Sequence, residues 1–133
     1  MRDDVKNWIV KAENDLKVAM HEIETKEPVT DAICFHAQQC VEKYLKAFLV
    51  YYNQSFRKTH NISEILVICI EKDPEFKNLQ QINAHELTVY ATELRYPEFF
   101  HIPSIEEAKE AIEIAKKVKE FVIKKLRIQQ GEI

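Results

Sequence analysis

The sequence predicts an all-α fold, an up-and-down antiparallel helical bundle of four long helices plus one shorter helix. Two observations predict it. The 133 residues include one Gly and four Pro, too few for the turns that a sheet of short strands needs. Apolar residues make up 46% of the chain, and they recur at steps of three and four residues, which is typical of amphipathic helices. This length suits a single domain over residues 1–133.

Five segments carry the helical spacing. The expected helices cover about residues 3–26, 30–53, 62–72, 78–94 and 104–129. The second is apolar over most of its circumference, so we expect it to be the central helix. Because the connections are short, an antiparallel bundle is the most economical packing for these segments.

Local signals mark the helix ends. Thr30 is the expected N-cap of the second helix. Asp73-Pro74 and Tyr96-Pro97 should end the third and fourth helices, because proline disfavours a helical conformation in the residue before it. Ser104-Ile-Glu-Glu107 has the Ser-x-x-Glu form of a capping box, and Gln129-Gln-Gly131 should end the last helix.

The second helix also has a narrow polar face. Its members are spaced at i, i+3, i+4 and i+7, so they lie on one side of the helix: Gln39, Glu42, Lys43 and Lys46. This face must meet solvent or a polar partner.

Charge and composition restrict the function. The net charge of −3 argues against broad wrapping of nucleic acid, which normally requires a basic excess, and leaves room for a small anion site. No apolar run approaches the roughly 20 residues that span a bilayer, so we expect a cytoplasmic protein without a membrane partner. Three cysteines without Cys-x-x-Cys spacing suggest reduced core thiols.

The segment Arg95-Tyr-Pro-Glu-Phe-Phe-His101 is where the residue types point to chemistry. Arginine is a permanent, forked cation suited to phosphate, and an unperturbed histidine has a pKa of about 6.5, so it exchanges a proton near neutrality. This pair suits phosphodiester chemistry. The alternative is structural: Arg95 caps a helix C-terminus and His101 is a surface imidazole in a turn.

Metal and cofactor sites lack support in the sequence. Glu98 and His101 have the Glu-x-x-His spacing of di-iron bundles, but a second such pair is missing. His36 and Cys40 are i, i+4 neighbours without further ligands, so core packing is the better explanation. The only Gly, Gly131, excludes a glycine-rich phosphate loop. We therefore expect no metal and no cofactor.

Several separated stretches together resemble the HEPN (higher eukaryotes and prokaryotes nucleotide-binding) domain family over most of the chain. They are Trp8 with Ala12, Asp15 and Leu16; Phe35-His-Ala-Gln-Gln; Glu42-Lys-Tyr-Leu-Lys-Ala; Lys58-Thr-His60; and Leu94-Arg-Tyr-Pro97. Proteins similar to this are helical bundles that commonly dimerise. Many carry an Arg, four to six residues, and then a His as the signature of metal-independent RNA cleavage, and Arg95 and His101 fit that spacing.

The resemblance implies a homodimer in which two copies of Arg95 and His101 share one cleft. Tyr96 and Glu98 would orient His101 or the substrate, although a surface turn explains both equally well. Short members of the family are often encoded with a minimal nucleotidyltransferase, which acts as the antitoxin. In some pairs that partner modifies a Tyr two residues after the motif His, where this chain has Pro103.

Two functions remain open at this point. The first is a dimeric ribonuclease toxin that acts on RNA through Arg95 and His101. The second is a non-catalytic helical subunit that binds a nucleotide or substrate for a nucleotidyltransferase. In the second, Lys43, Lys46, Lys58 and His60 would form a polar patch facing a nucleotide or a partner, although solvated helix and loop residues would look the same.

Overall fold

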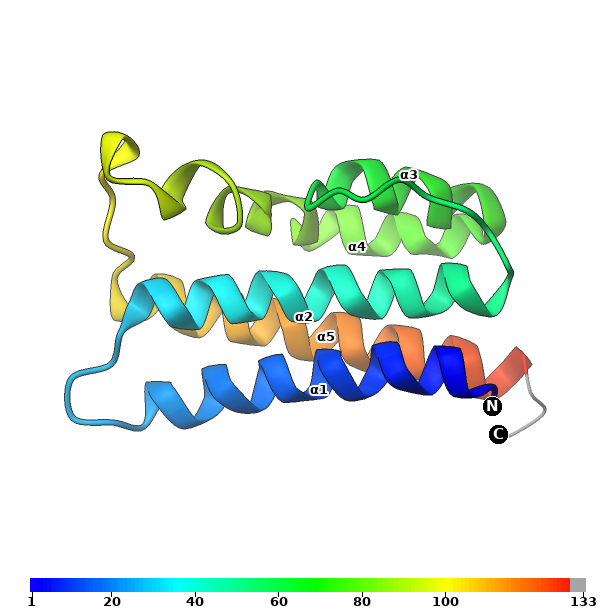
Figure 1. Cartoon of the computed structure of the whole chain (residues 1–133), viewed down its shortest axis with the longest axis horizontal. Coiled ribbons are helices and arrows are strands. Elements are labelled where there is room, and N and C mark those ends of the chain that lie inside the picture. The colour runs from blue at the N-terminus through cyan, green and yellow to red at the C-terminus, as the bar shows by residue number, and fades with distance from the viewer. Residues whose placement is uncertain (130–133) are drawn as a thin grey trace.

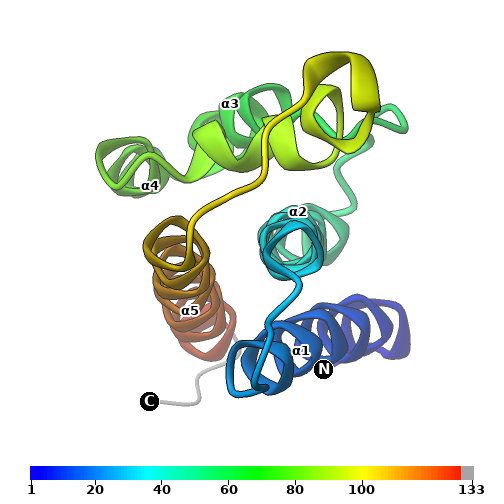
Figure 2. The ribbon, with the colours of Figure 1, turned by 90° about the vertical axis from the view of Figure 1, so that its left-hand side faces the viewer.

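The computed structural model describes residues 1–129, and all the regular structure in this range is helical, as the sequence predicts. Three long helices run the length of the molecule, with two shorter ones over one side (Figures 1 and 2). The helices are α1 (Asp3–Ile23), α2 (Thr30–Tyr51), α3 (Ile62–Lys72), α4 (Lys77–Gln81) and α5 (Ile105–Gln129).

Helix α2 is the central helix, as its apolar circumference predicts. It packs against α1, α5 and α3 (Figure 2). Tyr44, Leu45 and Phe48 are fully buried in the core. The Phe48 ring lies 4.3 Å, between centroids, from that of Phe76, and Phe76 lies 4.9 Å from Phe121 of α5. These aromatic contacts join the layer of short helices to the long helices.

The helix directions follow a simple up-and-down order only in part. Helix α1 is antiparallel to α2 (Figure 1), but residues 52–61 then return along α2 as an irregular segment. The His60 carbonyl accepts a hydrogen bond from Gln38 (3.0 Å), and further along both helices Cys69 donates to the Leu45 carbonyl (3.8 Å). Helix α3 therefore runs parallel to α2, because the connection is long enough to cross back before α3 begins.

The fourth long helix expected over residues 78–94 is replaced by shorter pieces. Helix α4 ends at Gln81, and Asn83 has a left-handed backbone (φ 62°), which asparagine tolerates better than most residues. A 3₁₀ segment, Ala84–Tyr90, and a 3₁₀ turn, Glu93–Arg95, follow. Buried Ala84 and Leu87 are three residues apart, a spacing that suits the 3₁₀ helix as well as the α-helix, so the apolar pattern could not distinguish them.

Helix ends differ from the expected ones by a few residues, and one signal is confirmed. The cap residue of α2 is Val29 rather than Thr30, which is buried inside the helix. Ser104 accepts a hydrogen bond from the Glu107 amide (3.1 Å), as in a capping box. The expected helix end at Gly131 lies outside the described residues. None of the helices described over residues 1–129 has both the length and the apolar character for a membrane crossing.

Candidate functional site

The candidate site lies at one end of the bundle. The start of α2, the start of α5 and the irregular segment between Ala91 and Ser104 meet there, at the end opposite the N-terminus (Figure 1). Tyr96 is extended (φ −107°, ψ 140°), as expected for a residue before proline, and Pro97 opens a short 3₁₀ turn. This turn stops the chain from continuing the segment that ends at Arg95, and it carries His101 toward α5.

The Arg95 side chain lies on the ring of Phe35 from α2. The guanidinium Cζ is 4.7 Å from the ring centroid, within the range of a cation–π interaction. Among the described residues Arg95 takes part in no ion pair with a carboxylate. This contact uses none of the guanidinium N–H groups in a hydrogen bond to an oxygen, so Arg95 is held in place while its donors remain available to an anion.

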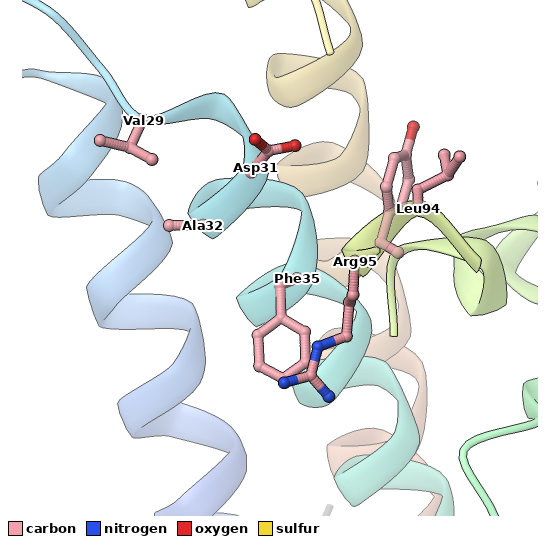
Figure 3. A pocket seen from close by; sticks show the side chains of 7 residues that line it. Val29, Asp31, Ala32, Phe35, Leu94 and Arg95 are labelled. Atoms are coloured by element: carbon pink, nitrogen blue, oxygen red, sulfur yellow. The ribbon is translucent and has the colours of Figure 1, made fainter. Parts of the chain in front are cut away.

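A pocket of about 310 Å³ lies beside Arg95. Figure 3 shows the Arg95 guanidinium over the Phe35 ring on one side of the pocket. Asp31, from the first turn of α2, lies on the other side of the pocket. The full lining consists of Val29, Asp31, Ala32, Phe35, Tyr90, Leu94 and Arg95.

His101 is held by a carboxylate from α5. Its Nε2 lies 3.0 Å and 3.2 Å from the two Glu107 carboxylate oxygens. The Tyr90 hydroxyl donates a hydrogen bond to the same carboxylate. Tyr90, Glu107 and His101 therefore form one hydrogen-bonded chain that connects the 3₁₀ segment, α5 and the irregular loop.

The electrostatics of this chain determine which nitrogen carries the proton. Partial burial raises the pKa of Glu107, but the hydrogen bonds from Tyr90, His101 and the Ser104 backbone and the charge interaction with His101 together lower it by more, so the net pKa is below the ordinary value. Burial, and then the bond to Glu107, raise the pKa of Tyr90, so Tyr90 stays a hydroxyl donor. Because an ionised carboxylate only accepts, Nε2 of His101 must carry the hydrogen, and Nδ1 of a neutral His101 holds the lone pair.

Tyr90 connects the surroundings of Arg95 and His101. It lines the pocket beside Arg95 and also bonds to Glu107, which holds His101. The structure thus brings the two residues predicted from the sequence to the same end of the bundle. Tyr96 and Glu98 are exposed on the turn between them, and the residue that orients His101 within the chain is Glu107 instead.

Sequence reasoning missed the supporting residues Phe35, Tyr90 and Glu107. Glu107 was recognised only as part of a capping box, in which the glutamate side chain ordinarily turns back to the N-cap amide. Here that carboxylate also meets Tyr90 and His101. A capping-box glutamate six residues after the motif histidine was the available signal, but the position of Tyr90 depends on the 3₁₀ path of residues 84–90.

The polar face of α2 meets polar partners within the protein. Lys43 pairs with Asp15 (2.6 Å), and the same carboxylate bonds to His36 (2.8 Å). Lys46 pairs with Glu42 (2.9 Å), and its side chain is only 7% exposed. Both lysines are thus occupied in ion pairs between or within helices.

His60 and Lys58 are more accessible than these lysines. His60 Nδ1 lies 2.9 Å from the Glu42 carboxylate, with about half of its side chain exposed. Lys58 is exposed in the segment before α3. Of the four residues proposed for a nucleotide or partner patch, the structure therefore leaves Lys58 and His60 at the surface and places Lys46 inside. Residues 1–129 contain no group of three or more His, Cys, Asp or Glu side chains arranged to hold a metal ion.

Large apolar side chains are exposed around the motif. Phe100, directly before His101, is 80% exposed, and Ile102, directly after it, is 62% exposed. Tyr96 and Phe99 are each about half exposed. Apolar residues gathered on one short surface segment are typical of an interaction site.

Comparison with known proteins agrees with the geometry. The family model for the HEPN domain matches residues 5–126, so the chain belongs to the HEPN family. A solved crystal structure of an archaeal HEPN homologue is similar, with 27% sequence identity and a TM-score of 0.72, over 94% of this chain and 98% of that one. A comparison with curated protein sequences finds no significant match.

Proposed function

We propose that this protein is a metal-independent endoribonuclease that works as a homodimer in the cytoplasm. The observation that carries the proposal is how the two motif residues, Arg95 and His101, are held. Arg95 is stacked on Phe35 without a carboxylate partner among the described residues, and His101 is held at one nitrogen only. A free guanidinium and an oriented imidazole are the two groups that cleavage of an RNA phosphodiester requires.

The reaction follows from the side chains. The Nδ1 atom of a neutral His101 accepts the 2′-hydroxyl proton of RNA as the 2′-oxygen attacks the adjacent phosphorus. The protonated His101 of the second subunit donates a proton to the departing 5′-oxygen. Arg95 stabilises the charge on the crowded phosphate. The products are a 2′,3′-cyclic phosphate and a free 5′-hydroxyl, and DNA resists because it lacks the 2′-hydroxyl.

The exposed apolar residues support the dimer. Tyr96, Phe99, Phe100 and Ile102 flank both motif residues, and burying them against a second copy would remove a large apolar area from water. A two-fold axis through this face would bring both copies of the motif to one cleft. The acceptor and donor histidines of the mechanism would then come from different subunits.

A minimal nucleotidyltransferase is the proposed antitoxin partner, and membership in the HEPN family supports it. The residue two places after the motif histidine is Pro103, which is buried two residues before α5 begins. A partner would therefore neutralise this protein by covering the site or by modifying a different residue.

The test of the nuclease is RNA cleavage in the presence of a chelator. Wild type, Arg95→Ala and His101→Ala are purified identically, and 5′-labelled RNA and its all-deoxy counterpart are incubated with each. We expect wild type alone to cut RNA, each variant to lose about 10²- to 10⁴-fold in rate, and DNA to stay intact. Equal activity in all three proteins would identify a contaminant and refute the proposal.

A second candidate is a non-catalytic subunit that binds a nucleotide or substrate for a nucleotidyltransferase. The net charge of −3 favours it, because broad RNA binding normally uses a basic surface. Wild type that binds the partner enzyme, changes its activity and cuts no RNA would select this function.

A further inference from the structure

The pocket beside Arg95 has the features of a nucleobase site. Its walls combine the Phe35 ring with the aliphatic side chains of Val29, Ala32 and Leu94. Its volume of about 310 Å³ exceeds that of a single base. Sequence-specific recognition of RNA generally places an unstacked base against aromatic or guanidinium planes and reads its Watson–Crick edge. The Phe35 ring and the Arg95 guanidinium contact each other at 4.7 Å and both line the pocket, so a base in it would lie against one or the other.

Asp31 is the polar group that this pocket offers to a base. It lies one helical turn before Phe35 on the same face of α2, and Figure 3 shows it on the opposite side of the pocket from the guanidinium. Among the described residues its carboxylate has no hydrogen-bond or ion-pair partner. A free carboxylate beside a phosphate site weakens RNA binding by repulsion, unless a base compensates by donating hydrogen bonds to it.

The chemistry of the carboxylate selects one base. An ionised carboxylate accepts hydrogen bonds through two oxygens and donates none. Guanine presents two adjacent donors, N1–H and the 2-amino group, on its Watson–Crick edge. Adenine and cytosine place a lone pair next to their amino group, and uracil places its single N–H between two carbonyls, so each of these bases sets a lone pair against Asp31.

We infer that this pocket binds a guanine next to the scissile phosphate, with its Watson–Crick edge on Asp31 and its phosphate on Arg95. This inference rests on the proposed ribonuclease function and adds the substrate class to it. Phe35 would supply the stacking surface, and the protein would cut single-stranded RNA at guanosine.

Binding of nucleoside 3′,5′-bisphosphates, measured by calorimetry, tests the pocket without requiring cleavage. We expect wild type to bind guanosine bisphosphate about 5- to 150-fold more tightly than the uridine, cytidine and adenosine compounds, the range given by one good bidentate pair. Asp31→Asn should abolish that preference, because an amide offers one acceptor where guanine needs two. Phe35→Leu should weaken all four ligands.

Glu27→Gln is the matched control. It removes one exposed carboxylate from the loop just before α2 without touching the pocket lining, so the guanine preference should remain. Equal affinity for all four compounds in wild type, or an unchanged preference in Asp31→Asn, would overturn the inference.

Mapping of cleavage sites separates this inference from the proposed function. Cleavage of RNA without preference for guanosine would refute the guanine pocket but would still support the proposed ribonuclease function. Selective binding of guanosine bisphosphate by a protein that cuts no RNA would support the pocket and refute the nuclease.

Discussion

The same tyrosine–glutamate pair occurs twice in this protein with a different third partner. Between the long helices, the Tyr44 hydroxyl donates to Glu13, which also pairs with Lys119 of α5 (2.9 Å). At the end of the bundle, the Tyr90 hydroxyl donates to Glu107, which also holds His101 (3.0 Å). The two glutamate side chains are almost equally exposed, at 29% and 30%.

The third partner determines what each cluster can do. A lysine ammonium offers only donors, so Lys119 helps the Glu13 cluster to join α1, α2 and α5 but supplies no basic ring nitrogen for a substrate proton. A histidine held at Nε2 keeps a second ring nitrogen free, and this nitrogen can accept a proton. One hydrogen-bonding unit therefore stabilises packing in the first place and orients a proton acceptor in the second.

The largest expected effect is on cleavage. Glu107→Gln removes the negative charge that favours the Nε2–H form of His101, and we expect the RNA cleavage rate to fall about 10- to 100-fold, part of the 10²- to 10⁴-fold due to proton transfer. The matched variant Glu13→Gln should keep the wild-type rate.

The kinetic constants of the two variants distinguish a positioning role of the glutamate from a purely structural role. Loss of positioning should lower kcat more than it raises KM, and it should alter the pH profile of kcat. Equal losses in Glu107→Gln and Glu13→Gln would mean that both glutamates act only through folding.

The next largest effect is on the free energy of unfolding. Loss of the glutamate should cost more stability in the Glu13 cluster than in the Glu107 cluster. Glu13→Ala leaves the hydroxyl of fully buried Tyr44 without its acceptor, which should lower the free energy of unfolding by about 1–3 kcal/mol. Tyr90 is only half-buried, so water can replace the acceptor in Glu107→Ala, and we expect a loss of under about 1 kcal/mol. Urea denaturation measures both, and the reverse order would contradict the structural role of Glu13.

Acid should weaken both clusters together. Burial raises the pKa of Glu13, but the hydrogen bonds from Tyr44 and Lys119 and the charges of Lys119 and Lys17 together lower it by more, and the pKa of Glu107 is likewise lowered. A carboxylate with a lowered native pKa stabilises the fold above its unfolded pKa of about 4.3, and this contribution is lost as the pH falls through the native pKa.

Thermal denaturation as a function of pH tests this expectation. The wild-type melting temperature should fall as the pH drops below about 4.3, and the double variant Glu13→Gln, Glu107→Gln should show a shallower fall. Parallel curves for the two proteins would show that other carboxylates dominate acid unfolding.

The smallest expected effect comes from making the two clusters alike. Lys119→His creates a second Tyr–Glu–His chain, in which the imidazolium gains a carboxylate partner. Its native pKa should then lie above its unfolded value of about 6.5, so the stabilisation is present below that pH and is lost as the pH rises through the native pKa.

The size of this effect should be under about 1 kcal/mol, because the site is partly exposed and solvent screens the pair. Urea denaturation at pH 5.5 and pH 8.5 measures it, with wild type as the reference. A variant equally stable relative to wild type at both pH values would contradict the predicted pairing.

The sequence predicted the positions of the helices more completely than the residues of the candidate site. The apolar stripes predict α1, α2, α3 and α5 because burial on one face repeats every three or four residues. The same spacing failed over residues 78–94, where a left-handed Asn83 and 3₁₀ geometry replace a long helix. Arg95 and His101 were proposed as site residues from their chemistry, whereas their neighbours Phe35, Tyr90 and Glu107 were not, because those contacts join different elements.

By itself, the sequence determined the all-α class, the central place of α2 and the presence of an arginine and a histidine near a proline turn. These properties depend on local spacing and residue type, which a single chain displays directly. Only the tertiary structure decided that α3 runs parallel to α2, that the Arg95 guanidinium lies over the Phe35 ring and that the Glu107 carboxylate meets Tyr90 and His101. Each of these depends on groups distant in sequence meeting in space, and no local pattern specifies such a meeting.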